Sequence, residues 1–158
     1  MITEFNDGSV KMFAGMVLKA GGQYNDGMLM DETIEPGTVV GTVPDDSAGG
    51  YNGRSAQELS DQTPIAGIVT ADARSGMRKY RQFGPVPVLR DGFICVVAQT
   101  DVTAGDLVGY DATGKIGAAD GETGSGGGSS GSYFALGPNC IFLDDAAAGE
   151  EVPIRILL

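Results

Sequence analysis

The sequence contains no histidine and no tryptophan, and it has only two cysteines and ten basic residues against 21 acidic ones. Without histidine, neither a Ser-His-Asp nor a Cys-His catalytic arrangement can form. A zinc site needs about four ligands, more than the cysteines supply. The phosphate-binding pattern Gly-x-x-x-x-Gly-Lys-Ser/Thr is absent as well. The sequence therefore predicts a protein that is not an enzyme, with no catalytic residues, no metal site and no cofactor.

The shortage of basic residues gives a formal net charge of −11. Phosphate backbones and anionic membranes are bound through Lys and Arg, so we expect neither nucleic acid nor a membrane as a partner. An acidic protein can still dock on a basic protein surface. The acidic pairs Asp45-Asp46, Asp144-Asp145 and Glu150-Glu151 lie in predicted turns. We interpret them as solvated turn residues, because none has the spacing of a calcium loop.

Long apolar runs are also missing. No stretch approaches the ~20 residues of a transmembrane helix. Residues 1–7 lack the basic start and apolar stretch of a signal peptide, so we expect synthesis and retention inside the cell. Cys95 and Cys140 lie in apolar runs. We interpret them as buried free thiols, although the sequence alone leaves a disulfide open.

Glycine is abundant instead, with 26 of 158 residues, against about 7% in average proteins. Because glycine weakens helices and serves turns with positive φ, we predict an all-β fold. It would be a single compact β-barrel, β-tulip or jelly-roll-like domain with short strands, long loops and little helix. The predicted strands are 16–19, 27–30, 38–43, 65–70, 79–88, 93–98, 152–158 and, as a hairpin, 107–110 with 115–117.

Three of these strands carry positional information. The continuous apolar run 93–98 predicts a strand buried on both faces. In 152–158 every second residue is apolar, which predicts a strand with one buried face. Pro85 and Pro87 cannot donate to a ladder, so we expect 79–88 to be an edge strand.

The domain organisation follows from composition. Residues 1–14 have no clear periodicity and are predicted to form an N-terminal arm or edge strand, followed by a single β domain over 15–158. Within it, 44–61 is predicted as a long surface loop in which 55–59 has the pattern of one helical turn. Residues 120–132 have the composition of a flexible Gly/Ser-rich loop.

One turn pattern occurs three times, at 34–40, 102–108 and 146–152. In each, Pro or Ala precedes Gly, and a strand follows with Val three residues past the Gly. Pro or Ala suits the first corner of a tight turn, and Gly takes positive φ at the second. The unequal spacing of the three copies indicates a reused turn type and not a repeat array.

Four segments then follow one another in a recognisable order: Ile34 to Gly41, Pro64 to Val69, Gly92-Phe93, and Val102 to Tyr110. This order, with the small size and the acidic, glycine-rich composition, resembles head decoration and structural cement proteins of tailed bacteriophages over roughly residues 15–116. The resemblance implies a compact β domain on the virion, made in the host cytoplasm. It would bind the outer surface of the head and stabilise contacts between major capsid protein subunits. It also implies a homo-oligomer, most simply a trimer, with a dimer as the alternative.

Two segments are candidates for partner binding. Half of the basic residues fall within 74–90, with no acidic residue among them, which indicates either a solvated basic loop or an electrostatic patch for an acidic neighbour. The weak local pattern of 1–14 is compatible with an arm that adds a strand to a partner's sheet. The predicted partner-binding residues are Ile2, Phe5, Met12, Phe13, Arg74, Arg78, Lys79, Arg81 and Arg90.

Two other functions stay open. A β-barrel ligand- or glycan-binding module of a phage particle would need an exposed aromatic cluster, which five Tyr and six Phe supply poorly once the core is filled. A carrier domain would need a lysine at a hairpin tip. Only Lys115, after Gly114, has that position, and the residues around it lack a lipoyl-type pattern.

Overall fold

The computed structural model describes residues 12–20, 24–29, 33–42, 53–54, 59–71, 80, 85–120 and 133–158. In these residues there is no helix, and the regular structure consists of short β-strands. The strands are β1 (Val17–Ala20), β2 (Tyr24–Leu29), β3 (Val39–Thr42), β4 (Gly53–Arg54), β5 (Ile65–Val69), β6 (Pro85–Leu89), β7 (Asp91–Val97), β8 (Val108–Tyr110), β9 (Ile116–Ala118), β10 (Phe134–Ala135), β11 (Ile141–Phe142) and β12 (Glu151–Leu157). The all-β prediction is confirmed.

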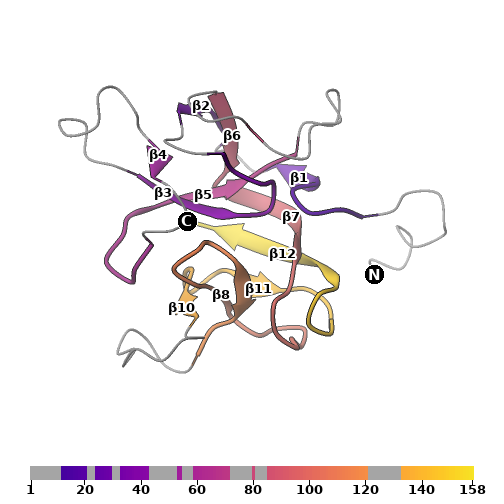
Figure 1. Cartoon of the computed structure of the whole chain (residues 1–158). Helices are drawn as coiled ribbons and strands as arrows, with labels where there is room; N and C mark the ends of the chain where they lie inside the picture. Colours follow the sequence, from indigo (N-terminus) through magenta and orange to yellow (C-terminus); the bar gives the residue numbers. More distant parts are fainter. Residues whose placement is uncertain are drawn as a thin grey trace.

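The strands pair antiparallel in three sheets (Figure 1). Sheet I has the order β1-β7-β12-β11, sheet II the order β2-β6-β5-β3-β4, and sheet III the order β10-β8-β9. Within the described residues these sheets do not close into a barrel. No helix in this part of the chain has the length and apolar character that crossing a membrane requires.

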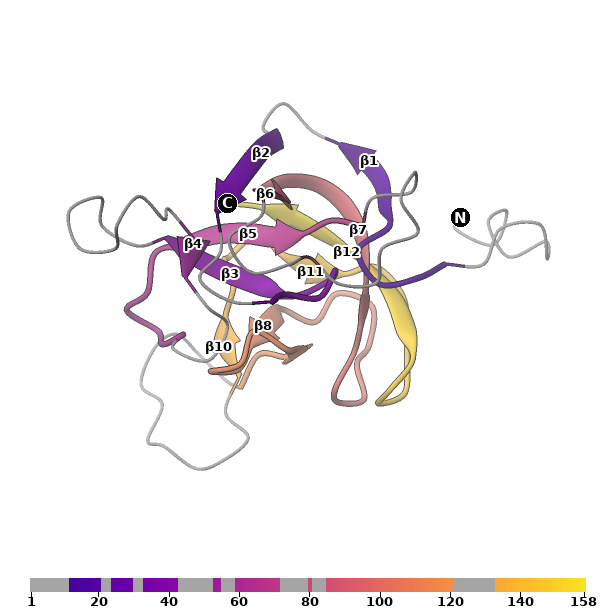
Figure 2. The same ribbon diagram turned by 45° about the horizontal axis from the view of Figure 1, so that its top comes forward.

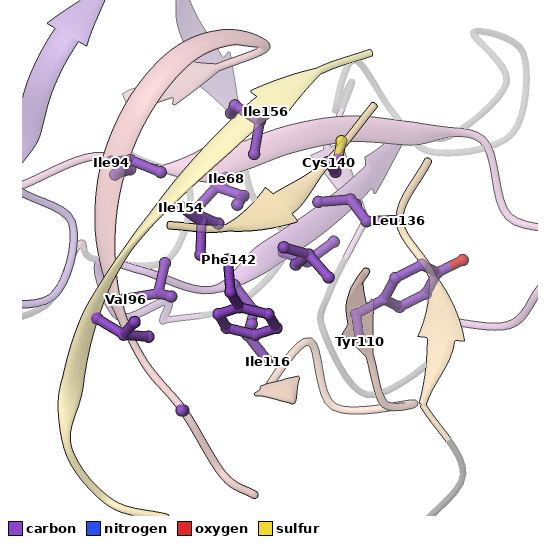
Figure 3. Close-up of a cluster of buried hydrophobic side chains, with 14 of the residues drawn as sticks. Ile68, Ile94, Val96, Tyr110, Ile116, Leu136, Cys140, Phe142, Ile154 and Ile156 are labelled. Carbon is purple, nitrogen blue, oxygen red and sulfur yellow. The ribbon is translucent and has the colours of Figure 1, made fainter. Parts of the chain in front are cut away.

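The main hydrophobic core lies where the three sheets meet (Figure 3). Alternate residues of β12 point into it, because Ile154 and Ile156 are fully buried while Arg155 between them is exposed. This pattern confirms the predicted period-two strand. Burial of each such side chain contributes about 1.5–3 kcal/mol. The core also takes side chains from the other sheets, including Val39, Ile68, Leu89, Ile94, Val96, Val108, Tyr110, Ile116, Leu136, Cys140 and Phe142.

Strands β3 and β5 of sheet II are buried on both faces. Val39 and Ile68 face the main core, whereas Val40 and Val69 belong to a second core on the other face. Tyr80 closes this second core, and its hydroxyl donates to the Thr70 carbonyl at 2.7 Å. Burial on two faces explains why β3 and β5 appear in the sequence as nearly continuous apolar runs. The second core consists of Ile34, Val40, Ala66, Val69, Tyr80, Val86 and Val88.

The prediction that 93–98 is a central strand is confirmed, since β7 lies between β1 and β12. The prediction of an edge strand at Pro85 and Pro87 is wrong. Strand β6 lies between β2 and β5. The pairing with β2 shifts register between Asn25 and Met28, opposite Pro87, and a bulge is where a ladder tolerates a residue without an N–H.

The surface-loop prediction for 44–61 is wrong at two places. Gly53–Arg54 form β4, which pairs with β3. Leu59 is 3% exposed and belongs to the main core. Its N–H donates to the Ala112 carbonyl at 3.2 Å, which fixes the end of this segment against the β8–β9 turn. Residues 55–58, within the predicted helical turn, and residues 121–132 lie outside the described residues.

Both cysteines are buried free thiols, as predicted. Burial, followed by the negative charge of Glu151, raises the pKa of the Cys95 thiol to about 12. Burial also raises the pKa of Cys140, against smaller opposing effects of the Leu157 backbone and Arg155. Neither thiol is ionised near neutral pH, so both act as small hydrophobic side chains.

Candidate functional site

Two turns lie side by side at one end of the molecule (Figure 2). We call residues 101–106 the first acidic turn and residues 145–150 the second acidic turn. Val102 and Ala146 join them as an isolated antiparallel bridge. Val102 N–H donates to the Ala146 carbonyl at 2.9 Å, and Ala146 N–H donates back to the Val102 carbonyl at 3.1 Å. The bridge makes the two turns one structural unit.

Each turn is closed by the same internal contacts. In the first, Asp106 N–H donates to the Thr103 carbonyl at 3.0 Å, and the Asp106 carboxylate accepts the Thr103 N–H at 2.9 Å. In the second, Glu150 N–H donates to the Ala147 carbonyl at 3.1 Å, and the Glu150 carboxylate accepts the Ala147 N–H at 3.0 Å. The acidic residue after each glycine is therefore part of the turn. The prediction of a turn residue is confirmed for Glu150, whereas Glu151 begins β12, and the pair Asp45-Asp46 lies outside the described residues.

The glycines bind the opposite copy in the same way. Gly105 has φ 96° and donates its N–H to the Phe142 carbonyl at 2.8 Å. Gly149 has φ 91° and donates to the Ala98 carbonyl at 2.7 Å. Both φ values are in the region that favours glycine, which confirms the predicted role of this residue in the repeated turn. The contacts of the two turns are related by a local two-fold arrangement.

The two turns also cap each other with aspartates. The Asp145 carboxylate accepts the Ala104 N–H at 2.9 Å. In return, the Asp101 carboxylate accepts the Ala148 N–H at 2.9 Å. Each turn thus depends on a side chain from the other, and the unit is held rigid at its exposed tip.

The third copy of the turn, at 34–40, also has a two-hydrogen-bond bridge and a glycine N–H contact, but with two separate partner segments. Ile34 and Tyr80 exchange N–H donors at 3.1 and 2.8 Å, and Gly37, with φ 81°, donates to the Val69 carbonyl at 2.7 Å. The difference lies at Pro36, which stands where the acidic turns have Ala104 and Ala148. Proline has no N–H to cap, so this turn needs no carboxylate. The capping aspartates Asp101 and Asp145 directly precede the bridging residues of the acidic turns. At the corresponding position before Tyr80 the sequence has Lys79.

The acidic unit carries a concentrated negative charge. Among the described residues, no group of three His, Cys, Asp or Glu side chains is arranged to hold a metal ion. The carboxylates are exposed, and those of Asp101, Asp106, Asp145 and Glu150 accept hydrogen bonds from backbone N–H groups of the turns. The acidic side chains of this end are Asp101, Asp106, Asp144, Asp145, Glu150 and Glu151.

Six of the predicted partner-binding residues lie outside the described residues: Ile2, Phe5, Arg74, Arg78, Lys79 and Arg81. The structure places the other three. Arg90 lies at the β6–β7 connection, where its carbonyl accepts the Leu158 N–H at 3.1 Å. Its Nε is buried and has no hydrogen-bond partner in the described structure.

Phe13 is anchored at its backbone and exposed at its side chain. Its carbonyl accepts the Met16 N–H at 3.0 Å, and the turn between them has Gly15 at φ 83°. A Cβ on Gly15 would lie 2.5 Å from the Pro36 Cβ, so this turn is pressed directly onto the turn at 34–40. The Phe13 side chain is 43% exposed and Met12 is half-buried.

The β8–β9 hairpin was predicted and is confirmed, with Gly114 at φ 77°. The Asp111 carboxylate organises its turn, since it accepts N–H groups of Thr113 at 2.8 Å and Lys115 at 3.0 Å. Lys115 pairs with Glu35 at 3.6 Å, with both side chains about half exposed. The only candidate lysine for a carrier domain is thus used in a contact between turns.

Two hydrogen bonds, which we call the clamp, join Asp120 and Tyr133 on either side of the segment 121–132. Tyr133 N–H donates to the Asp120 carboxylate at 2.9 Å, and Asp120 N–H donates to the Tyr133 carbonyl at 3.1 Å. The Tyr133 ring lies over Gly117, where a Cβ would be 2.7 Å from the ring. Gly117 therefore leaves the space that the Tyr133 ring occupies.

The comparisons with known proteins agree with this architecture. The sequence matches, over residues 3–157, the protein family described as "Structural cement protein (E217 gp24/Pam3 gp6)". A similar solved structure is a chain of the capsid of Myoviridae phage XM1, with a TM-score of 0.65, 20% identity, and coverage of 95% of this chain and 93% of that one. This likeness shows a shared fold. The base of the head fiber gp8.5 of bacteriophage phi29 aligns with a TM-score of 0.47 and 10% identity over 85% of this chain and 94% of that chain. No curated protein matches the sequence.

Proposed function

Because this chain belongs to the family of phage structural cement proteins, we propose that it decorates the outer surface of a phage head and stabilises contacts between neighbouring major capsid protein subunits. The single observation that supports this proposal most strongly is the family match, which extends over nearly the whole chain. The proposed activity is mechanical and needs neither a cofactor nor chemistry.

The mechanism would depend on the rigidity of the domain and on the number of copies bound to one head. A cement protein must transmit load between capsid subunits without deforming. Two hydrophobic cores and the mutually capped turns are the features that would resist such deformation. Each copy would bury a modest interface, and the many copies on one head would act together.

We also propose that the protein is a homo-oligomer, most simply a trimer at local three-fold positions of the capsid, with a dimer as the alternative. Light scattering on the purified protein distinguishes these states from a monomer. The result decides how many capsid subunits one assembly can join.

The N-terminal residues and the basic segment are proposed as partner contacts. Gly15 is packed on Pro36, so a deletion that is meant to leave the fold intact should end before Met12. Removal of residues 1–11 is expected to weaken capsid binding while thermal stability is kept. Substitution of Arg74, Arg78, Lys79 and Arg81 by glutamine tests the basic segment in the same way. Unchanged binding in either variant would exclude that segment from the interface.

The experiment that tests the proposed function is co-sedimentation of the purified protein with undecorated capsids of the phage that encodes it. We expect saturable binding with a fixed number of copies per capsid. A protein that stays in the supernatant at concentrations well above those in an infected cell would contradict the proposal.

A further inference from the structure

One face of sheet I, together with the adjoining Leu107, carries a row of side chains that points away from the main core, and all of them except Arg155 are apolar. Residues directly opposite in antiparallel strands have side chains on the same face. Leu107 bridges Ile141, Ile141 pairs with Arg155, and Arg155 pairs with Phe93. The row therefore crosses from the first acidic turn through β11 and β12 to β7.

Burial shows that this is the outward face. Ile154 and Ile156, which alternate with the row on β12, are fully buried, whereas Arg155 and Leu157 are exposed. Leu157 shares the outward face with Arg155 because it lies two residues further along the strand. Figure 3 shows the opposite, inward side, where Ile94, Ile154 and Phe142 gather with Ile68.

The outward face exposes large apolar side chains to solvent. Three large hydrophobic side chains are exposed in the described part of the chain, and two of them, Leu107 at 44% and Leu157 at 39%, lie on this face. Ile141 lies between them and Phe93 lies on the other side of β12, and both are half-buried. We call Leu107, Ile141, Phe93, Arg155 and Leu157 the docking patch. Contiguous exposed apolar surface on a soluble protein marks an interaction site.

The charges around the docking patch specify the kind of partner. Asp91 pairs with Leu157 and Glu151 pairs with Val97 on the same face. Between Glu151 and Arg155, the pair Pro153 and Cys95 on this face is buried, so the exposed part of the face lies at Arg155 and Leu157. At the Leu107 end, the first acidic turn adds exposed carboxylates. The rim of the docking patch is thus mainly acidic.

We propose that the docking patch seats a surface of the major capsid protein that has an apolar centre and a basic rim. This inference rests on the proposed cement function and names the face that performs it. A second copy of this chain fits less well, because it would bring a second set of the same carboxylates to the rim of a protein whose net charge is already −11.

The substitutions Leu107→Gln and Leu157→Gln, combined in one variant, remove the apolar contact and leave the net charge unchanged. We expect the fold to accept a polar residue at position 107, because Glu151 occupies the equivalent position after the second acidic turn. The comparator is Ala112→Gln, which introduces the same polar side chain at an exposed position of the β8–β9 turn, outside the docking patch and outside the segments proposed as partner contacts.

Binding of the three proteins to undecorated capsids is measured by co-sedimentation, with thermal melting and light scattering on each. We expect the double variant to bind at least tenfold more weakly than the unmodified protein, with unchanged melting temperature and oligomeric state, and binding of the unmodified protein to weaken as salt is raised. Affinity within twofold of the unmodified protein, in a folded double variant, would overturn the inference and leave the cement function standing. Loss of oligomerisation in that variant would also overturn it, because the patch would then join copies of this chain. If the unmodified protein itself does not bind, the proposed function fails and the inference fails with it.

Discussion

Asp101 and Asp145 cap each other's turns: the Asp101 carboxylate accepts the N–H of Ala148, and the Asp145 carboxylate accepts the N–H of Ala104, both at 2.9 Å. The two aspartates are thus equivalent members of one arrangement. Neither turn can be capped without the other, so loss of one aspartate affects both halves of the unit.

The first prediction concerns these caps. Asp101→Ala or Asp145→Ala leaves a backbone N–H without its charged acceptor, and each is expected to lower the free energy of unfolding by about 1 kcal/mol. The double variant should lose less than the sum of the two, because the first substitution already loosens the shared bridge. Chemical denaturation of the single and double variants measures this coupling.

The control for the caps is Asp61→Ala, which removes an exposed carboxylate that makes no hydrogen bond among the described residues. It should change stability by less than about 0.5 kcal/mol. Equal effects of Asp61→Ala and Asp145→Ala would show that net charge, and not capping, is what the measurement detects.

The second prediction compares two glycines with similar φ. Gly149 has φ 91° and open space where a Cβ would point, whereas a Cβ at Gly15, with φ 83°, would meet Pro36 at 2.5 Å. Gly149→Ala should cost only the backbone strain of about 1–2 kcal/mol. Gly15→Ala should cost more by a further ~1–3 kcal/mol, since two turns must separate. Urea unfolding curves test the order, and equal costs would contradict the direct packing of the two turns.

The third prediction concerns the thiols. The pKa of Cys95 is raised from 9.0 to about 12 in the folded protein, so above pH 9 the unfolded chain releases a proton that the folded chain retains. Stability is therefore unaffected below pH 9 and falls as the pH rises toward 12. Unfolding free energies between pH 7 and pH 11 should show this decline.

The matched variant for the thiol prediction is Cys95→Ala, in which the alkaline decline should become shallower. The remaining decline is due to Cys140, Tyr110 and Tyr133, because burial also raises the pKa of each of these groups. In the native protein at pH 8, thiol reagents should label both cysteines only as fast as the protein opens. Rapid labelling of Cys95 under native conditions would be incompatible with its burial.

The fourth prediction concerns the clamp between Asp120 and Tyr133. Because these residues exchange two hydrogen bonds, the fold on either side does not depend on the length of the segment between them. Replacement of 121–132 by a three-residue Gly/Ser linker is expected to leave the melting temperature within about 2 °C, since loop length enters stability only weakly. Asp120→Ala should destabilise the protein more than the replacement does, and the reverse order would show that the segment itself supports the fold.

Much of this architecture could be predicted from local patterns. The alternation in β12, the apolar run of β7 and the Pro-Gly and Ala-Gly corners each reflect a local physical requirement: a half-buried face, burial on two faces, or positive φ. These requirements are written into a few consecutive residues, and the structure confirms them.

The wrong predictions concern residues whose environment is set by segments far away in the sequence. Pro87 looks like an edge residue until the register shift in β2 opposite it is known. Leu59 looks like part of a polar loop because its partner Ala112 lies far away in the sequence. The equivalence of Asp101 and Asp145 is visible in the sequence only once the bridge between Val102 and Ala146 is known.

The outward apolar row could have been found in part. The period-two pattern of β12 already places Arg155 and Leu157 opposite its buried residues. Leu107 joins them only through its pairing with Ile141, which no local pattern encodes. Sequence-based selection favoured basic and N-terminal residues instead, because charge clusters are visible without a fold.

The most direct test of the cement function is the temperature at which DNA escapes from filled heads that lack this protein, measured before and after the purified protein is added to full occupancy. We expect bound protein to raise this release temperature by several degrees, and the Leu107→Gln, Leu157→Gln variant at the same concentration to raise it less. Heads that bind the protein fully and still release their DNA at the original temperature would contradict the claim that it stabilises the capsid.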